Sequence, residues 1–241
     1  MKKIILTLCL TCAAATTLSA QLADISSPTP LLKGVESEMY NPVLSADGKQ
    51  LMFSASDYTN LRTFDFESGA VSKINANRAQ AYKARFDAND NVTFNYATSV
   101  RTEGSTLYIT VNGRETGYSP VESYAGYLWE SLSPDGQKVM FVAAGHGVVI
   151  TDLKGNVLAH LGNYEAPVWY NNDLVVVQKS TDDGHQYKTS QILMIKADGS
   201  ETQAITRPES MTFSPAASAE AQKIVYNTID GRLYQVNVTL K

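Results

Sequence analysis

The chain has 241 residues, of which 44% are hydrophobic, and its formal net charge is −4. This length and apolar content suffice for one large all-β domain or two small ones. The 20 Lys and Arg residues are outnumbered by 24 acidic residues and form no basic stripe, which argues against nucleic acid as a partner.

The first 20 residues have the pattern of a secretory signal peptide. A short basic start, Met1-Lys2-Lys3, is followed by an apolar run from Ile4 to Ala15, and Leu18-Ser19-Ala20 offers a small-residue cleavage site. A membrane anchor needs roughly 20 apolar residues, more than this run contains. We therefore expect a mature chain of residues 21–241 that forms one domain, is periplasmic or secreted, and does not insert into a membrane.

Both cysteines, Cys9 and Cys12, lie in this leader segment. The mature chain therefore has no disulfide, no zinc-thiolate site and no cysteine nucleophile. Loss of Lys2 and Lys3 with the leader changes the formal charge from −4 to −6. We expect the mature protein to fold without a metal or cofactor, because repeated apolar strands supply its core.

A hairpin pattern recurs along the mature chain. In its clearest copy an apolar strand ends at Ser133-Pro134, Asp135-Gly136 makes a turn, and Val139-Met140-Phe141 begins the return strand. Five copies, spaced 37 to 46 residues apart, have the apolar anchors Leu44, Phe86, Leu132, Trp169 and Phe213. Self-similarity at this period in a strand-rich chain predicts a β-propeller.

Further strands complete each repeat. Second strands are expected at 51–53, 92–94, 139–141, 174–177 and 224–226, and third strands at 61–66, 106–111, 148–153, 192–196 and 233–238. A fourth strand follows in four repeats only, because the chain ends soon after the last third strand. The segment Pro30–Val35 stands before the first repeat, and we expect it to complete the last blade and cover its open edge. The prediction is an all-β propeller of five four-stranded blades, closed by the N-terminal strand.

The turn Ser133-Pro134-Asp135-Gly136, the following Phe141, and the later Asp152-Leu153-Lys154-Gly155-Asn156 resemble the WD40-like PD40 repeats of TolB-type β-propellers. The resemblance covers nearly all of the mature chain and is weakest in the second and fourth repeats, where Pro-Asp-Gly is absent. It implies an exported bacterial protein with a propeller fold. The motif residues form turns and core, so the resemblance implies no catalytic residue.

Length variation is confined to one face of the ring, which carries the connections between second and third strands and those between successive blades. These long connections, which define the long-loop face, are expected at 54–60, 97–105, 143–147 and 179–190. Loops that only reverse the chain stay short, so this face is the predicted functional face.

Four tyrosines stand near the start of their repeats' first strands, where they would surround the mouth of the central channel. They are Tyr40, Tyr82, Tyr127 and Tyr164. A ring of tyrosines can stack on sugars or grip a peptide. The alternative is that each packs between neighbouring blades with its hydroxyl bonded at the rim.

The connection 179–190 carries the second group of candidate ligand-binding residues, Asp182, Asp183, His185, Tyr187 and Lys188. These side chains offer two carboxylates, an imidazole and an ammonium, a mixture suited to ligand binding beside the channel mouth. The alternative is a polar turn. The spaced oxygen ligands of a calcium loop are missing, so we predict no metal site.

Two functions remain open from the sequence. The first is a non-enzymatic propeller that binds an envelope protein, a peptide or a glycan on the long-loop face. The second is a polysaccharide-lyase-like enzyme acting on acidic glycans at the channel mouth, with Arg85, His146, His185 and Lys188 as its candidate residues. The sequence has no Gly-x-Ser-x-Gly elbow and no phosphate-binding loop, which favours binding over catalysis.

Overall fold

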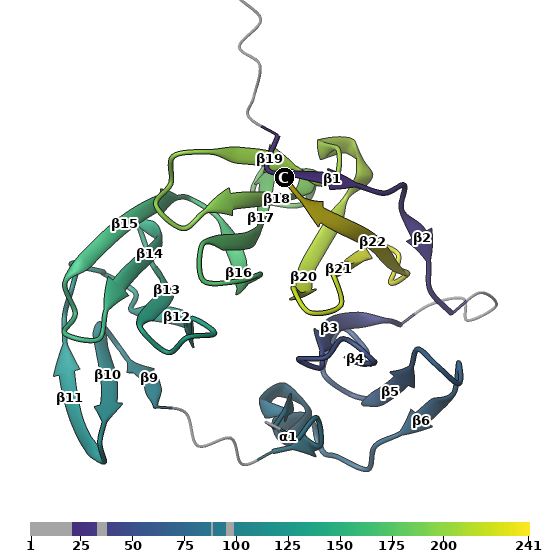
Figure 1. Ribbon diagram of the computed structural model, residues 1–241, viewed down its shortest axis with the longest axis horizontal. Helices are drawn as coiled ribbons and strands as arrows, with labels where there is room; N and C mark the ends of the chain where they lie inside the picture. Colours follow the sequence, from purple (N-terminus) through teal and green to yellow (C-terminus); the bar gives the residue numbers. More distant parts are fainter. Residues whose placement is uncertain (1–20, 33–37, 88, 95–98) are drawn as a thin grey trace, which may run out of the picture.

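The computed structural model describes residues 21–32, 38–87, 89–94 and 99–241, so the leader segment lies outside the described residues. The strands form antiparallel sheets arranged one after another in a ring (Figure 1). The predicted all-β propeller with five repeated units and a closing N-terminal strand is confirmed.

Three units have four strands each, hydrogen-bonded in chain order. Their strands are β3 (Tyr40–Leu44), β4 (Gln50–Ser54), β5 (Arg62–Asp65) and β6 (Val71–Lys73); β12 (Tyr127–Leu132), β13 (Lys138–Ala143), β14 (Gly147–Asp152) and β15 (Val157–Gly162); and β16 (Glu165–Trp169), β17 (Leu174–Asp182), β18 (Tyr187–Lys196) and β19 (Thr202–Ala204). In each unit the first strand is the innermost, next to the ring axis (Figure 1).

The last unit is completed by the N-terminus. Its strands β20 (Thr212–Ser218), β21 (Lys223–Thr228) and β22 (Leu233–Leu240) are followed in the sheet by β1 (Ala23–Ile25), and β2 (Thr29–Pro30) also pairs with β22. Figure 1 shows β1 beside the C-terminus. The closing strand starts earlier than predicted, because Ala23 already pairs with Leu240, whereas 33–35 of the predicted segment lie outside the described residues.

The second unit departs from the regular pattern. A short helix, α1 (Arg78–Lys83), precedes β7 (Arg85–Phe86), which pairs with β8 (Val92–Thr93); a separate sheet contains β9 (Val100–Glu103), β10 (Thr106–Val111) and β11 (Arg114–Tyr118). A capping box fixes the start of α1, since Asn77 and Gln80 exchange side-chain and backbone hydrogen bonds. The helix takes the place of the first half of an inner strand, and β8 and β9 together take the place of one second strand.

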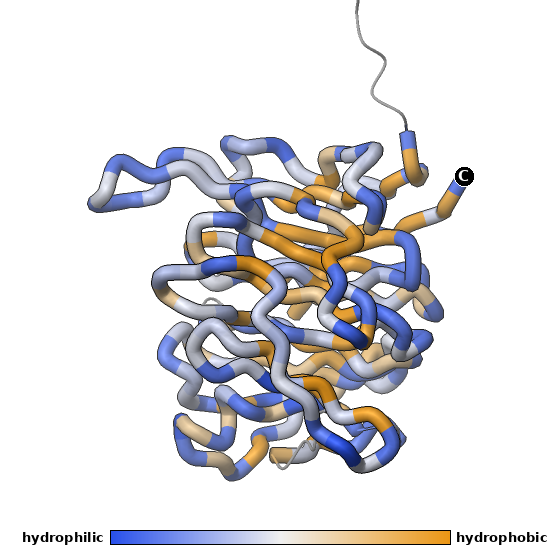
Figure 2. Tube along the Cα trace, turned by 90° about the vertical axis from the view of Figure 1, so that its left-hand side faces the viewer, coloured by the Kyte–Doolittle hydropathy of each residue, from blue (hydrophilic) through white to orange (hydrophobic). Residues whose placement is uncertain are grey.

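Buried apolar side chains gather at the contacts between neighbouring units. The described residues form five such clusters, each with members from two adjacent units. The second strands contribute most to them, as expected, with Phe53, Phe141, Val177 and Tyr226 at most 2% exposed. Figure 2 shows the hydrophobic residues along the strands and the hydrophilic ones at the turns. Burial between blades therefore holds the ring together.

The turns between first and second strands explain the repeated Ser-x-Asp-Gly pattern. The buried Ser45 hydroxyl donates to Asp47 over 2.8 Å and accepts the backbone N–H of Gln50 over 2.9 Å. Ser133 makes the same two kinds of bond, and its hydroxyl lies 2.6 Å from Asp135. This hydroxyl and backbone N–H donors hold the pKa of Asp135 below its usual value.

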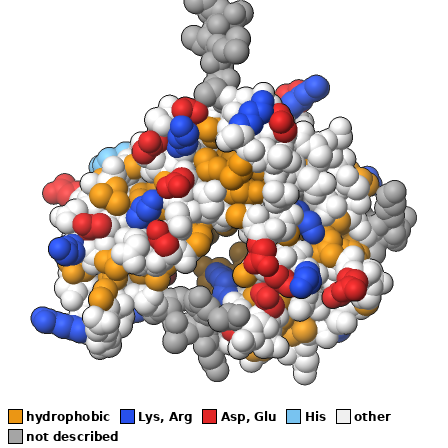
Figure 3. Space-filling model, in the orientation of Figure 1, with side chains coloured by type: hydrophobic (Ala, Val, Ile, Leu, Met, Phe, Trp, Pro, Cys, Tyr) orange, Lys and Arg blue, Asp and Glu red, His pale blue; other side chains and the backbone are white. Residues whose placement is uncertain are grey.

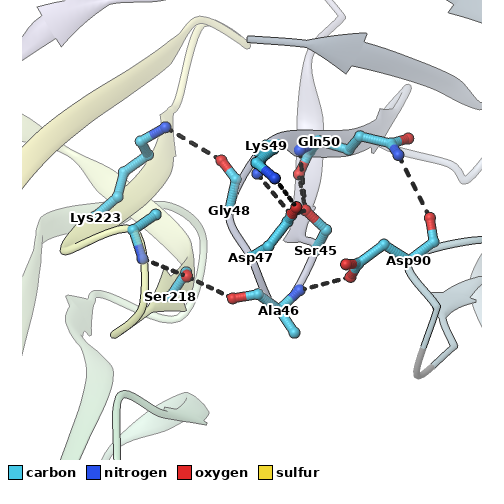
Figure 4. A network of polar contacts seen from close by, with 10 residues as sticks. Ser45, Ala46, Asp47, Gly48, Lys49, Gln50, Asp90, Ser218 and Lys223 are labelled. Atoms are coloured by element: carbon cyan, nitrogen blue, oxygen red, sulfur yellow. Dashed lines mark hydrogen bonds and ion pairs between the residues drawn. The ribbon is translucent and has the colours of Figure 1, made fainter. Parts of the chain in front are cut away.

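These turns also join neighbouring units (Figure 4). The backbone of Ala46 accepts a bond from the Ser218 hydroxyl of the last unit, over 2.7 Å, and donates to Asp90 of the second unit, over 3.0 Å. In the third unit, Asp135 N–H donates to the Asn172 side chain of the fourth unit, over 2.9 Å. Residues of these turns therefore link each of these units to its neighbours in the closed ring.

Candidate functional site

A cavity of about 440 Å³ lies where the inner strands meet. Strands β3, β12, β16 and β20 line it, together with α1, β7, and residues of β4 and of the connection that follows it. Figure 3 shows a hollow at the centre of this face, with hydrophobic and basic side chains in its wall. A concave site at the meeting point of several elements is the usual place for a ligand.

All four inner strands that line the cavity contain the same β-bulge. In each, two residues oppose a single residue of the second strand. The bulges are 41–42 opposite Phe53, 129–130 opposite Phe141, 166–167 opposite Val177, and 214–215 opposite Tyr226. A bulge interrupts the strand alternation, so these pairs present their side chains differently from a regular strand.

The first residue of every bulge has a left-handed backbone. The φ angles are 54° at Asn41, 56° at Trp129, 44° at Ala166 and 49° at Ser214. Such a conformation costs a non-glycine residue about 1–3 kcal/mol, and it is especially unusual for a bulky side chain such as that of Trp129. Backbone strain of this kind gathers at functional sites. The four strained positions therefore mark the cavity as the candidate site.

Buried polar groups hold the bulge of β20 in place. The Gln178 side chain, only 5% exposed, accepts the backbone N–H of Ser214 over 3.0 Å. Its amide group also donates to the Glu165 carboxylate over 2.6 Å and to the Ser180 hydroxyl over 2.8 Å. Because Gln178 belongs to the fourth unit and Ser214 to the fifth, the bulge geometry is tied to the packing of two blades.

Four aromatic side chains contribute to the cavity wall. Tyr58 and Tyr82 meet edge to face, with ring centroids 5.1 Å apart, and burial raises the pKa of Tyr58. Trp129 is 48% exposed, whereas Trp169 is half-buried and its Nε1 donates to the Ser131 carbonyl over 3.5 Å. Exposed rings beside a cavity offer flat apolar faces for stacking.

Among the described residues that line the cavity, Arg85 and Glu130 carry charge. Arg85 Nη1 donates to the carbonyl oxygens of Ala84 over 2.7 Å and Tyr82 over 3.2 Å, which fixes the guanidinium near the wall. Glu130 Oε2 accepts a bond from the Thr102 hydroxyl over 3.0 Å. The wall thus combines one cation and one anion, both anchored, with neutral hydroxyl and amide groups.

The structure does not bring the four predicted tyrosines together. Tyr82 lines the cavity and is 57% exposed. The Tyr40 hydroxyl instead donates to the Ile229 carbonyl, and Tyr164 packs against the apolar cluster between the third and fourth units. Tyr127 is 3% exposed, packs on Phe141 with centroids 4.6 Å apart, and its hydroxyl donates to the Val121 carbonyl. Three of the four therefore occupy packing positions.

The predicted 179–190 loop is an extended hairpin rather than a loop. Strands β17 and β18 pair from Leu174 with Lys196 out to Asp182 with Tyr187, and the cross-strand hydroxyls of Thr181 and Thr189 bond over 2.7 Å near the end of the hairpin. Only residues 183–186 form the connection. Two antiparallel strands joined by a short turn continue their ladder of hydrogen bonds, which favours a long hairpin over an irregular loop.

The candidate residues of this hairpin bond mainly to one another. Asp183 pairs with Lys188 over 2.7 Å and accepts the backbone N–H of His185 over 3.0 Å. The bond from Lys188 is the main reason that the pKa of Asp183 is lowered. Asp182 accepts the N–H of Gly184, and this pattern makes the tip a self-contained turn.

The Tyr187 ring lies at the base of this tip and packs on Phe213 of β20, with centroids 5.0 Å apart. Partial burial raises the pKa of Tyr187, whose side chain remains 45% exposed. The five hairpin candidates are all exposed, and none of them lines the central cavity.

The candidate residues of the enzymatic alternative lie in separate places. Arg85 lines the central cavity, whereas His146 lines another depression of about 690 Å³ together with Tyr124, which is 90% exposed. His185 and Lys188 lie at the hairpin tip. Among the described residues no group of three His, Cys, Asp or Glu side chains is placed to hold a metal ion.

The sequence reading missed most of the cavity wall, including Asn41, Trp129 and Glu130. One signal was available, because three of the four bulges contain a proline, at Pro42, Pro167 and Pro215, and the first two stand two residues before the anchors Leu44 and Trp169 of predicted inner strands. Proline within a strand points to a bulge or an edge. In the bulge that begins at Trp129 the second residue is Glu130 instead of proline, so the sequence gives no sign of this bulge.

Comparison with known proteins supports the fold. No protein-family model matches the chain, and no curated protein matches it in sequence. Among solved structures, a luciferin-regenerating enzyme aligns over 91% of this chain and 97% of its own, with a TM-score of 0.51 and 10% identity. Similarity at this identity shows the fold alone, a β-propeller.

The chain is also distantly similar in structure to TolB proteins. A TolB structure from Agrobacterium tumefaciens matches 84% of this chain and 79% of its own, with 16% identity and a TM-score of 0.43. TolB from Acinetobacter baumannii matches with 20% identity and a TM-score of 0.33. The match covers 68% of this chain and 42% of that TolB chain.

Proposed function

We propose that this protein is an exported β-propeller that binds a ligand in its central cavity, rather than an enzyme. The observation that carries the proposal is the cavity wall, where four strained bulges and four aromatic side chains surround a space of about 440 Å³. A site of this size and mixed character suits a small polar molecule or the end of a larger one, from an envelope protein, a peptide or a glycan.

The positions of the ionisable candidates support binding over catalysis. A general acid and base must reach the same substrate within hydrogen-bond distance. Arg85 lines the central cavity, His146 lines another depression, and Lys188 is engaged by Asp183 at the hairpin tip. An acidic glycan in the central cavity would meet Arg85 together with the Glu130 carboxylate, which is a poor arrangement for its carboxyl groups.

Binding is tested with the purified exported protein and three probe pools: neutral oligosaccharides, uronate oligosaccharides and short peptides. At a ligand concentration of 100 times Kd, native-state binding stabilises the protein by about 2.7 kcal/mol, which thermal unfolding detects. We expect at least one pool to raise the melting temperature and to change tryptophan fluorescence. Unsaturated product from the uronate pool, followed by absorbance, would contradict a non-enzymatic role.

Export is a separate part of the proposal, supported by the leader pattern in residues 1–20. The full-length chain with a C-terminal tag is expressed in a bacterium with two membranes, and the fractions are compared with those of a Leu8→Arg variant. A charge in the apolar run should block processing. We expect the parent in the periplasm or medium, starting at Gln21; an unprocessed parent in the cytosol would contradict export. Among the described residues no helix is long and apolar enough to span a membrane.

A further inference from the structure

The inner strands are poorly suited to bind a peptide by strand addition. Such binding requires a straight sheet edge with free backbone N–H groups. Each inner strand that lines the cavity is instead broken by a bulge, and Pro42, Pro167 and Pro215 remove an N–H donor from three of the four. Recognition in this cavity therefore depends on side chains rather than on a backbone ladder.

The size of the cavity suits a compact ligand. Its volume of about 440 Å³ lies in the usual range of small-molecule sites, about 300–1,000 Å³.

The side chains of the wall match the two kinds of surface of a sugar ring. Trp129, half-exposed, and Tyr82, 57% exposed, offer aromatic faces for the C–H face of a pyranose. Arg85 supplies donors and Glu130 supplies acceptors for ring hydroxyls, and both are already fixed by bonds to neighbouring groups. Asn41 and other neutral polar residues complete the wall.

The charges of the wall favour a neutral sugar over an acidic one. Arg85 and Glu130 are the charged residues among the described lining, and their charges cancel. A uronate carboxylate would be attracted by the Arg85 guanidinium and repelled by the Glu130 carboxylate, whereas a hydroxyl can form hydrogen bonds with both. We infer that the central cavity binds a neutral saccharide, with Trp129 as the stacking platform. This inference rests on the proposed binding function and specifies its ligand class.

The chain supplies its own reporter for this site. It contains two tryptophans, Trp129 and Trp169, and both line the cavity. Intrinsic fluorescence of the purified exported protein therefore reports on the cavity without a label. The titrants are neutral hexose and N-acetylhexosamine oligosaccharides of two to four units, uronate oligosaccharides of matched length, and a pool of uncharged pentapeptides.

Three cavity variants and one control separate the roles of the Trp129 ring and the Glu130 carboxylate. Trp129→Ala should weaken binding of the neutral saccharide by more than tenfold, measured by calorimetry, and Trp129→Tyr should recover a large part of the affinity. Glu130→Gln should weaken it about threefold to tenfold and should improve binding of the uronate. Tyr124→Ala, which removes an exposed ring outside the cavity, is the matched control and should leave affinity unchanged. Melting curves of each variant establish that it is folded.

The outcomes distinguish this inference from the proposed function. A saccharide that binds with a fluorescence change, and loses affinity in Trp129→Ala but not in Tyr124→Ala, supports both. Peptide binding with a fluorescence change but no saccharide binding overturns the inference and leaves the binding function standing. Tighter binding of uronates than of neutral sugars overturns the neutral class. No response to any titrant overturns the inference and counts against the binding function.

Discussion

Replacement of Gln178 by alanine tests whether contact between blades holds the bulged inner strand. Its side chain bonds to the Glu165 carboxylate, the Ser180 hydroxyl and the backbone N–H of Ser214 while almost fully buried. A bond to a charged group contributes about 1.5–3 kcal/mol, and each neutral bond contributes about 0.5–1.5 kcal/mol. The substitution also leaves the N–H of Ser214 without this partner. We expect the free energy of unfolding to fall by roughly 3–5 kcal/mol.

Urea unfolding of the purified protein measures this loss from the transition midpoint and the m-value. The control is Gln186→Ala, which removes the same side chain from the exposed tip of the β17–β18 hairpin and should change stability by less than about 0.5 kcal/mol. If the inference about the ligand holds, Gln178→Ala should also weaken saccharide binding, because Ser214 lines the cavity. A loss below about 1 kcal/mol would refute the reasoning that these bonds fix the bulge.

Three further outcomes follow from the turns and glycines. Ser133→Ala removes two short bonds of a buried hydroxyl and should destabilise by about 2–4 kcal/mol, whereas Ser200→Ala, in an exposed turn, should have little effect in thermal unfolding; equal losses would contradict this. Gly147→Ala should prevent folding to a soluble product, because its Cβ would lie 2.0 Å from the Gly162 carbonyl oxygen at a φ of 77°, and a normal melting curve would contradict the fold there. The folded-state pKa of Asp135 is lowered, so its stabilising effect is present above its unfolded pKa and is lost as the pH falls through the folded value. Asp135→Asn should therefore be less stable at pH 7 and lose less stability below about pH 4, and parallel stability curves for parent and variant would contradict it.

Repetition made the ring predictable. Apolar second strands and polar turns recur at a nearly constant period, and burial between neighbouring blades rewards that period, so unit count and ring closure follow from pattern alone. The closing edge was inferred from a missing strand, and β1 with β2 supplies it. Its start was misplaced because a short strand at the edge has little apolar alternation to mark it.

The fifth repeat shows how local resemblance can mislead an alignment. Ser214-Pro215 resembles the turn Ser133-Pro134, and this resemblance places Phe213 as the fifth anchor. In the structure Ser214 begins the bulge instead, and Ala217 occupies the place of the anchor, because Ala217 pairs with Ile224 as Leu132 pairs with Val139. The Ser-Pro dipeptide thus begins a turn in one repeat and a strand bulge in the other. The two cases differ only in the register of strand pairing, which a single sequence does not show.

The second repeat failed for the opposite reason. The local signal for α1 was present, since Asn77 and Gln80 stand three residues apart as in a capping box. The repeat pattern nevertheless predicted the start of a strand in this region, so the helix was missed. The helix at this position brings the Tyr82 ring into contact with the Tyr58 ring. The two tyrosines occupy different positions within their repeats, so the alignment of repeats gave no reason to pair them.

The four bulges give the strongest reason to assign a role to the cavity side chains. Glycine adopts a left-handed backbone without a steric penalty and is the usual first residue of a bulge with this conformation. A bulge that served only the shape of the sheet would be most stable with glycine at all four positions. The chain instead carries Asn41, Trp129, Ala166 and Ser214, each at a strained φ and each lining the cavity. At Trp129 the strained position holds the largest side chain and leaves it half-exposed, so neither backbone preference nor core packing accounts for it, whereas the proposed contact with a ligand would.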